Sequence, residues 1–118
     1  MNVQKVSFIE VSYTNNDDIR ILNAILSSWF SDPKILHFTA PNHQYPFKIS
    51  KWISLSYTDQ NIITFCLKLD NWIIGHISMK LNAEEKSAHL FHLIIDEKYR
   101  NKEYAKRLVK HIEKKLID

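Results

Sequence analysis

The stretch that decides the fold runs from Ile62 to Leu81 and reads IITFCLKLDNWIIGHISMKL. Two runs rich in β-branched and aromatic residues are separated here only by Asp70 and Asn71. Two turn-forming residues between such runs are typical of a β-hairpin. After a polar turn, residues 88–95 have the composition of a further strand. The centre of the chain is therefore predicted to be an antiparallel meander of three strands.

The flanking sequence adds one strand and three helices to this meander. Apolar residues alternate near the N-terminus and then recur at helical spacing in three segments. The predicted order is β-α-α-β-β-β-α, an α/β or α+β domain. We expect, in chain order, a strand within residues 3–13, a helix ending before residue 31, a loop over residues 31–46, a helix opened by Pro46 and a final helix over residues 102–116.

Length and composition place the chain in the class of small globular domains. It has 118 residues, of which 45% are hydrophobic and 25% are charged, so we expect one domain over residues 1–118. The single cysteine excludes a disulfide scaffold and a multi-thiolate zinc site. No apolar run is long enough to span a bilayer, and the N-terminus does not have the pattern of a signal peptide. We therefore expect a cytoplasmic protein.

The charge is concentrated at the C-terminal end. Residues 98–118 contain eight Lys or Arg and three Asp or Glu, whereas residues 1–97 contain eight and ten. The formal net charge of +3 is thus a basic final segment on a mildly acidic body. Such a segment suits an anionic ligand such as a nucleotide, a phosphate or a nucleic acid. The simpler alternative is the solvated face of a helix.

Residues 95–108 read IDEKYRNKEYAKRL. This stretch resembles the acyl-CoA-binding motif of the GNAT superfamily of N-acetyltransferases, in which a strand end and short loop lead into Gln/Arg-x-x-Gly-x-Gly/Ala at a helix start. Arg100, Ala105 and Leu108 match that pattern, and Gly75 is similar to a glycine often found in the family's third strand. The predicted element order is also similar to the first two-thirds of the family fold.

The resemblance implies a GNAT-like fold and acetyl-CoA as co-substrate, with an amine as acceptor and no metal. Amides at a helix N-terminus suit a diphosphate, because they are unpaired and carry partial positive charge. By resemblance, the loop and first helical turn would hold the pyrophosphate, and the strand end would contact pantetheine and the acyl carbonyl. The cofactor-binding residues implied in this way are Leu93, Ile94, Ile95, Arg100, Asn101, Lys102, Glu103, Tyr104, Ala105 and Lys106.

The chain departs from the family pattern in two respects. Glu103 stands where the first glycine is expected, which adds a side chain and a charge of the same sign as the phosphates; an ion pair with Arg107 would soften the repulsion. The family fold also continues with further strands and a helix, which often supplies a tyrosine as general acid. We therefore expect the N-terminal two-thirds of the fold, weak or incomplete activity in the isolated chain, and no residue here in the role of that acid.

A general base is the remaining chemical requirement. In family members that use one, a glutamate often lies on the fourth strand, and by spacing His89 occupies that position. The simpler alternative is a strand histidine with a satisfied hydrogen bond. His76 and His92 lie nearby, but no carboxylate or cysteine joins them at ligand spacing, so we expect no metal site. Cys66 and the three tryptophans are interpreted as packing residues.

Three functions stay open on the sequence alone. The first is an N-acyltransferase, completed by a second copy or another chain, with residues 31–46 helping to form the acceptor site. The second is a non-catalytic form of the fold acting as an interaction or dimerisation module through the unpaired edge of the strand at residues 88–95. The third is nucleic-acid binding by the final helix, which the acidic residues interrupting its basic patch disfavour.

Overall fold

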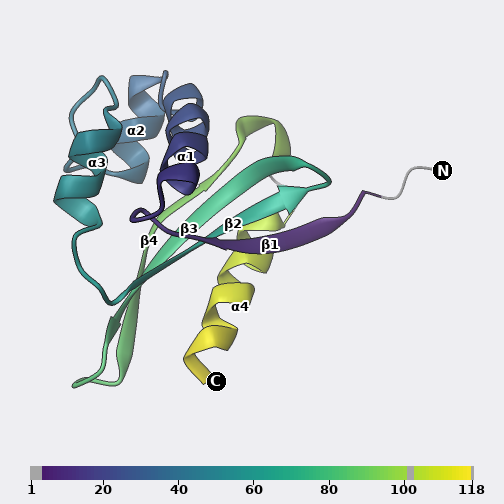
Figure 1. Cartoon of the computed structure of the whole chain (residues 1–118). Coiled ribbons are helices and arrows are strands. Elements are labelled where there is room, and N and C mark those ends of the chain that lie inside the picture. Colours follow the sequence, from purple (N-terminus) through teal and green to yellow (C-terminus); the bar gives the residue numbers. More distant parts are fainter. Residues whose placement is uncertain (1–3, 101–102, 118) are drawn as a thin grey trace. The chain divides into compact units, whose positions relative to one another are not determined.

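The predicted meander is present and forms the centre of a four-stranded sheet. The computed structural model describes residues 4–100 and 103–117. Strands β2 (Ile62–Leu69) and β3 (Trp72–Asn82) form the hairpin, and Asp70 has the left-handed φ of 55° that the tight turn requires. Strand β4 (Ser87–Ile95) pairs antiparallel with β3, and β1 (Val6–Val11) pairs antiparallel with β2. The order in the sheet is β1-β2-β3-β4 (Figure 1).

Three helices separate β1 from β2, one more than the sequence indicates. They are α1 (Asn16–Trp29), α2 (Pro33–Thr39) and α3 (Ile49–Ser56). The expected loop over residues 31–46 is therefore wrong in part. Asp32 accepts a hydrogen bond from the Lys34 N–H, and Pro33 occupies the first helical position, so a short helix forms there. Pro46 does not open the next helix, which begins at Ile49.

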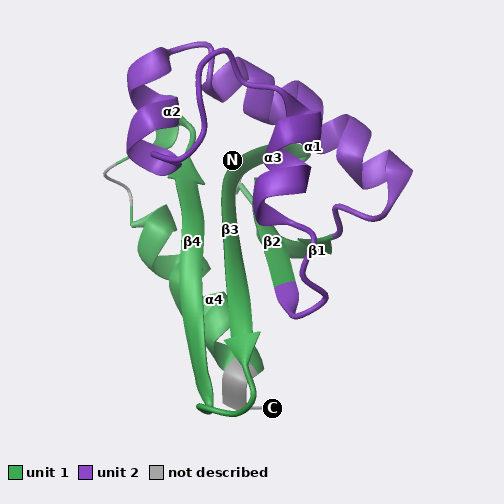
Figure 2. Cartoon of the chain, turned by 90° about the vertical axis from the view of Figure 1, so that its left-hand side faces the viewer, with its two compact units in different colours: residues 1–11, 63–118 green, residues 12–62 purple. Residues whose placement is uncertain are grey.

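The C-terminal part completes the order β-α-α-α-β-β-β-α. A short 3₁₀ helix, η1 (Glu97–Tyr99), follows β4 and leads towards α4 (Tyr104–Ile117). The chain divides into two compact units, coloured separately in Figure 2. One consists of residues 1–11 and 63–118, and the other of residues 12–62. Across the described residues, no helix has both the length and the apolar character that crossing a membrane requires.

The unit of residues 12–62 has an aromatic core centred on Trp52. The Trp52 side chain is fully buried, and its indole N–H donates to the Tyr13 hydroxyl at 2.9 Å. A partner for the indole N–H is needed because burying an unpaired polar group is unfavourable. The rings of Phe30, His43, Phe47 and Tyr57 lie with centroids 4.9–5.9 Å from that of Trp52.

The expectation that all three tryptophans pack in the interior is wrong for Trp72, whose side chain is 74% exposed.

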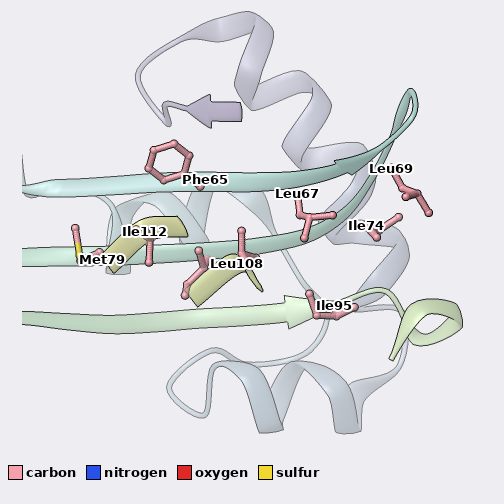
Figure 3. Packing of buried hydrophobic residues seen from close by; sticks show 9 residues of the cluster. Phe65, Leu67, Leu69, Ile74, Met79, Ile95, Leu108 and Ile112 are labelled. Carbon is pink, nitrogen blue, oxygen red and sulfur yellow. The ribbon is translucent and has the colours of Figure 1, made fainter. Parts of the chain in front are cut away.

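The other unit buries one face of the sheet against α4. Leu108 and Ile112 on α4 are fully buried and pack among side chains from β2, β3 and β4 (Figure 3). Their four-residue spacing places both on one helix face. Burying each such side chain contributes about 1.5–3 kcal/mol. His111 lies against β1 and β2, where its ring stacks on Phe8 at 4.2 Å between centroids.

An extra residue in β4 changes which side chains of that strand reach this core. Between two consecutive pairs with β3, β3 contributes one residue and β4 contributes two, His92 and Leu93. His92 has a φ of 52°, so the strand has a β-bulge at this point. Leu90 and Ile95 lie five positions apart, which puts them on opposite faces of a regular strand. The bulge allows both to pack into the core that includes α4.

Gly75 on β3 allows α4 and the strand end to approach closely. A Cβ atom at this position would lie 2.8 Å from Cδ1 of Ile95 and 3.3 Å from Cδ2 of Leu108. It would also lie 3.3 Å from Cβ of Leu67, an atom that moves only with its backbone. A larger residue at this position would force these neighbours to shift, which explains why glycine stands here.

Gly75→Ala is expected to lower the free energy of unfolding by about 1–3 kcal/mol, because the added methyl group overpacks the contact between β3, Ile95 and α4. Urea denaturation of the natural and variant chains measures this loss. Ser87→Ala, at an exposed position of β4, is the control and is expected to be nearly neutral. An alanine variant as stable as the natural chain would contradict the packing argument.

Candidate functional site

The loop after β4 is folded back onto the end of its own strand. The Asp96 N–H donates to the Ile74 carbonyl at 2.8 Å, and the Asp96 carboxylate accepts from the Lys98 N–H at 3.0 Å. The Arg100 side chain donates from Nε to the Ile95 carbonyl at 3.1 Å. These contacts fix the path of the chain from the last residue of β4 to Arg100. Arg100 therefore has a structural contact with the strand end, and its role beside a ligand stays a prediction.

Glu103 has the backbone conformation that a glycine would adopt most easily. Its φ is 65°, in the left-handed region, and its side chain is exposed. This conformation costs a residue with a Cβ atom about 1–2 kcal/mol. The Glu103 carbonyl accepts from the Arg107 N–H at 3.1 Å, which closes the first turn of α4. Glu103 therefore keeps the backbone conformation associated with glycine although the residue is glutamate.

The side chains around the start of α4 have different surroundings. Tyr104 and Ala105 are partly buried and pack against the core, whereas Lys106 is exposed. Asn101 and Lys102 lie outside the described residues. Within the described part of the chain, Glu103 and Arg107 form no side-chain ion pair, so the expected softening of the Glu103 charge is not present.

Positive charge gathers at the surface of α4. Lys106, Arg107 and Lys110 are all exposed, and Lys106 and Lys110 are separated by about one helical turn. The helix N-terminus contributes about half a positive charge to the same end. The arrangement provides attraction for an anion near the first turns of α4.

The last three residues of β4 lie on a strand at the edge of the described sheet, where β3 is the only neighbour. Leu93 is 39% exposed, whereas Ile94 and Ile95 are buried. An edge strand has backbone N–H and C=O groups that no second strand pairs. The side chains of Ile94 and Ile95 therefore serve packing, and any contact with a ligand at these positions involves the backbone.

The three histidines of β3 and β4 are in different environments. His89 is exposed, lies opposite Lys80 in the register, and stacks on Phe91 with 6.0 Å between ring centroids. His92 occupies the bulge, and His76 is fully buried. Among the residues that the structure describes, no three His, Cys, Asp or Glu side chains are grouped as metal ligands.

A contact between two of these histidines was not predicted from the sequence. The ring Nδ1 of His76 lies 2.8 Å from the His92 carbonyl oxygen. Because a carbonyl only accepts, His76 carries its proton on Nδ1. The left-handed conformation of His92 costs about 1–3 kcal/mol, and this hydrogen bond helps to stabilise it. The one available signal was the odd spacing between the apolar residues Leu90 and Ile95.

The buried His76 makes stability depend on pH. Burial lowers its pKa from 6.5 to about 4, while the hydrogen bond to the His92 carbonyl acts in the opposite direction. The unfolded chain binds this proton more readily than the folded chain. The contribution of His76 to the free energy of unfolding is therefore fully present above pH 6.5 and is lost progressively as the pH falls towards 4. Burial also lowers the pKa of His43 and of His111, and Lys115 and Lys114 add to the effect on His111.

Acidification from about pH 6.5 to 4 is therefore expected to lower the free energy of unfolding by up to about 3 kcal/mol through His76. Urea denaturation at a series of pH values measures the slope. His76→Asn removes the titrating ring and is expected to reduce the slope, to which His43 and His111 still contribute. His37→Asn, at an exposed position of α2, is the matched control. Equal slopes for the natural chain and His76→Asn would contradict this assignment.

Comparison with known proteins identifies a family of similar sequences. The profile described as the acetyltransferase (GNAT) family matches residues 22–118. A search of curated proteins gives no match.

Solved structures show the same fold. An aminoglycoside 6'-N-acetyltransferase complexed with coenzyme A has a TM-score of 0.64 at 16% identity, over 94% of this chain and 55% of that protein. The ribosomal-protein-S18-alanine N-acetyltransferase from Escherichia coli has a TM-score of 0.61 at 14% identity, over 95% of this chain and 59% of that protein. A GNAT family acetyltransferase from Staphylococcus aureus has a TM-score of 0.58 at 23% identity, over 92% of this chain and 76% of that protein. The chain thus spans less than two-thirds of the length of the first two proteins.

Proposed function

Because the chain belongs to the GNAT acetyltransferase family, we propose that it binds acetyl-CoA and transfers the acetyl group to an amine. The observation that carries this proposal is the left-handed Glu103 at the start of α4, directly after an edge strand and its folded-back loop. One structural neighbour holds coenzyme A, and another acts on an alanine of a ribosomal protein. These two neighbours support acetyl-CoA as the co-substrate and an amine as the class of acceptor, but they do not indicate which amine.

The pyrophosphate of acetyl-CoA is proposed to bind at the start of α4. Backbone N–H groups from Arg100 to Ala105 would cradle it, since a helix N-terminus offers unpaired donors and partial positive charge. Arg100 holds the loop through Ile95, and the exposed Lys106 adds attraction. Glu103 opposes binding through its charge, because its carboxylate is exposed at the same turn.

The acyl end is proposed to lie along the edge of β4. Backbone groups of Leu93, Ile94 and Ile95 would contact the pantetheine arm and the thioester carbonyl. An N–H aimed at that carbonyl stabilises the negative charge that forms on its oxygen when the amine attacks. The C–N bond forms, the C–S bond breaks, and coenzyme A leaves as a thiolate that takes a proton from solvent.

Acetyl-CoA calorimetry tests this function. We expect the natural chain to bind with a Kd in the micromolar range, and Glu103→Gln to bind about fivefold more tightly because the repulsive charge is removed at an exposed position. Glu103→Gly is expected to gain at least as much, since it also allows closer approach of the phosphates. The matched variant Glu113→Gln, on the same helix but away from its first turn, should leave the affinity unchanged. Absence of binding by all these chains would contradict the proposal.

His89 is proposed as the general base. Its ring is exposed on the edge strand that would carry the acyl group, and a neutral imidazole accepts a proton from an ammonium near pH 7. With an amine found by screening, His89→Gln is expected to lower kcat by about 10²–10⁴-fold with little change in acetyl-CoA affinity. His37→Gln is the matched control at an exposed position. Unchanged kcat in His89→Gln would exclude this role.

A non-catalytic interaction module is the second candidate function, and the edge of β4 favours it. This nine-residue strand contains no Lys, Asp, Glu or Pro, residues that commonly protect an edge from pairing, although its bulge at His92 limits regular pairing to the residues on either side of it. We propose that a second copy or another chain pairs here. Light scattering over a concentration series is expected to show a dimer, with slower amide exchange in residues 87–95 as it forms. A monomer at every concentration would contradict pairing between copies.

A further inference from the structure

The bulge of β4 places one peptide group in a position that its neighbours must hold. His92 has a left-handed φ of 52°, and the register with β3 shifts between His76 and Ser78. A bulged residue lies outside the regular ladder, so its backbone direction is not fixed by strand pairing alone. A separate contact is needed to select one orientation.

His76 supplies that contact from the neighbouring strand. Its ring is fully buried, and Nδ1 lies 2.8 Å from the His92 carbonyl oxygen, a normal hydrogen-bond distance. Burial keeps the ring neutral at pH 7, because its pKa is lowered to about 4. A neutral ring with its proton on Nδ1 can donate that proton to the His92 carbonyl.

The hydrogen bond also determines the direction of the next N–H group. The His92 C=O and the Leu93 N–H belong to one planar peptide unit, and in a trans peptide they point in opposite directions. Among the described residues, the one cis peptide bond is that between Tyr45 and Pro46. Holding the His92 carbonyl towards His76 therefore directs the Leu93 N–H away from His76.

We propose that His76 is a positioning residue, which holds the His92 carbonyl and so directs the Leu93 N–H towards the acyl oxygen of bound acetyl-CoA. This inference rests on the proposed function, which places the thioester carbonyl at residues 93–95. His76 does not touch the substrate. It acts through one rigid peptide group at the bulge.

The infrared carbonyl stretch of acetyl-CoA labelled with ¹³C at the thioester carbon tests this role. A hydrogen bond from an N–H lowers that frequency, so the natural chain is expected to shift the bound thioester to lower wavenumber than in buffer. His76→Leu removes the donor and is expected to abolish the shift, while its affinity for coenzyme A changes by less than about threefold. His76→Asn keeps an N–H donor on the atom attached to Cγ and is expected to retain the shift.

The other outcomes of this infrared experiment overturn either the positioning role of His76 alone or both proposals. A shift retained in His76→Leu, or absent from the acetyl-CoA complex of the natural chain, overturns the positioning role and leaves acetyl-CoA binding intact. No binding of acetyl-CoA by the natural chain overturns both proposals.

A measurement on the natural chain decides the matter if His76→Leu does not fold. The ¹⁵N resonances of the His76 ring show which nitrogen carries the proton. We expect the proton on Nδ1, and a proton on Nε2 alone would overturn the inference, because Nδ1 then cannot donate to the His92 carbonyl.

Discussion

One extra residue in β4 is the constraint on which the rest of its unit, residues 1–11 and 63–118, depends. Without the bulge at His92, Leu90 and Ile95 would lie on opposite faces of the strand. With it, Ile95 packs in the core that contains Leu108, and its carbonyl accepts the Arg100 side chain. The same irregularity that completes the core therefore also fixes the start of the candidate phosphate loop. The packing of Ile95 in the core and the proposed binding of acetyl-CoA therefore both depend on the bulge at His92.

The chain has only one glycine, so residues with a Cβ atom occupy its left-handed backbone positions. Its single glycine lies where Ile95, Leu108 and Leu67 leave no space for a Cβ atom. Within residues 4–100 and 103–117, the left-handed positions are occupied by Asp70, Lys86, His92 and Glu103. At His92 a buried histidine on the next strand stabilises the conformation, and at Glu103 the carbonyl closes the first turn of α4. Local hydrogen bonds thus accompany the conformations that glycine adopts more easily.

Patterns of short range predicted most of the fold. The hairpin around Asp70 and Asn71 is confirmed because turn residues and strand composition agree there. The helix of Pro33–Thr39 was missed because seven residues give too short an apolar period, although Asp32 and Pro33 form a good start signal. The bulge was missed because its cause, the contact between His76 and the His92 carbonyl, joins residues on two strands.

The candidate site was predicted in outline only. The motif at residues 95–108 located the loop and α4, but it did not show that Glu103 keeps a left-handed backbone. A left-handed backbone favours glycine, so the sequence indicated only that Glu103 adds a side chain and a repulsive charge at this position. The hydrogen bonds from Arg100 to the Ile95 carbonyl and from the Arg107 N–H to the Glu103 carbonyl depend on the folded structure.

An amide NMR titration of the ¹⁵N-labelled chain with coenzyme A shows directly whether the end of β4 and the start of α4 form the ligand site. The largest chemical-shift changes are expected in residues 93–106, at the end of β4, its loop and the first turn of α4. Changes confined to residues 12–62, or no changes at saturating coenzyme A, would contradict this location of the site.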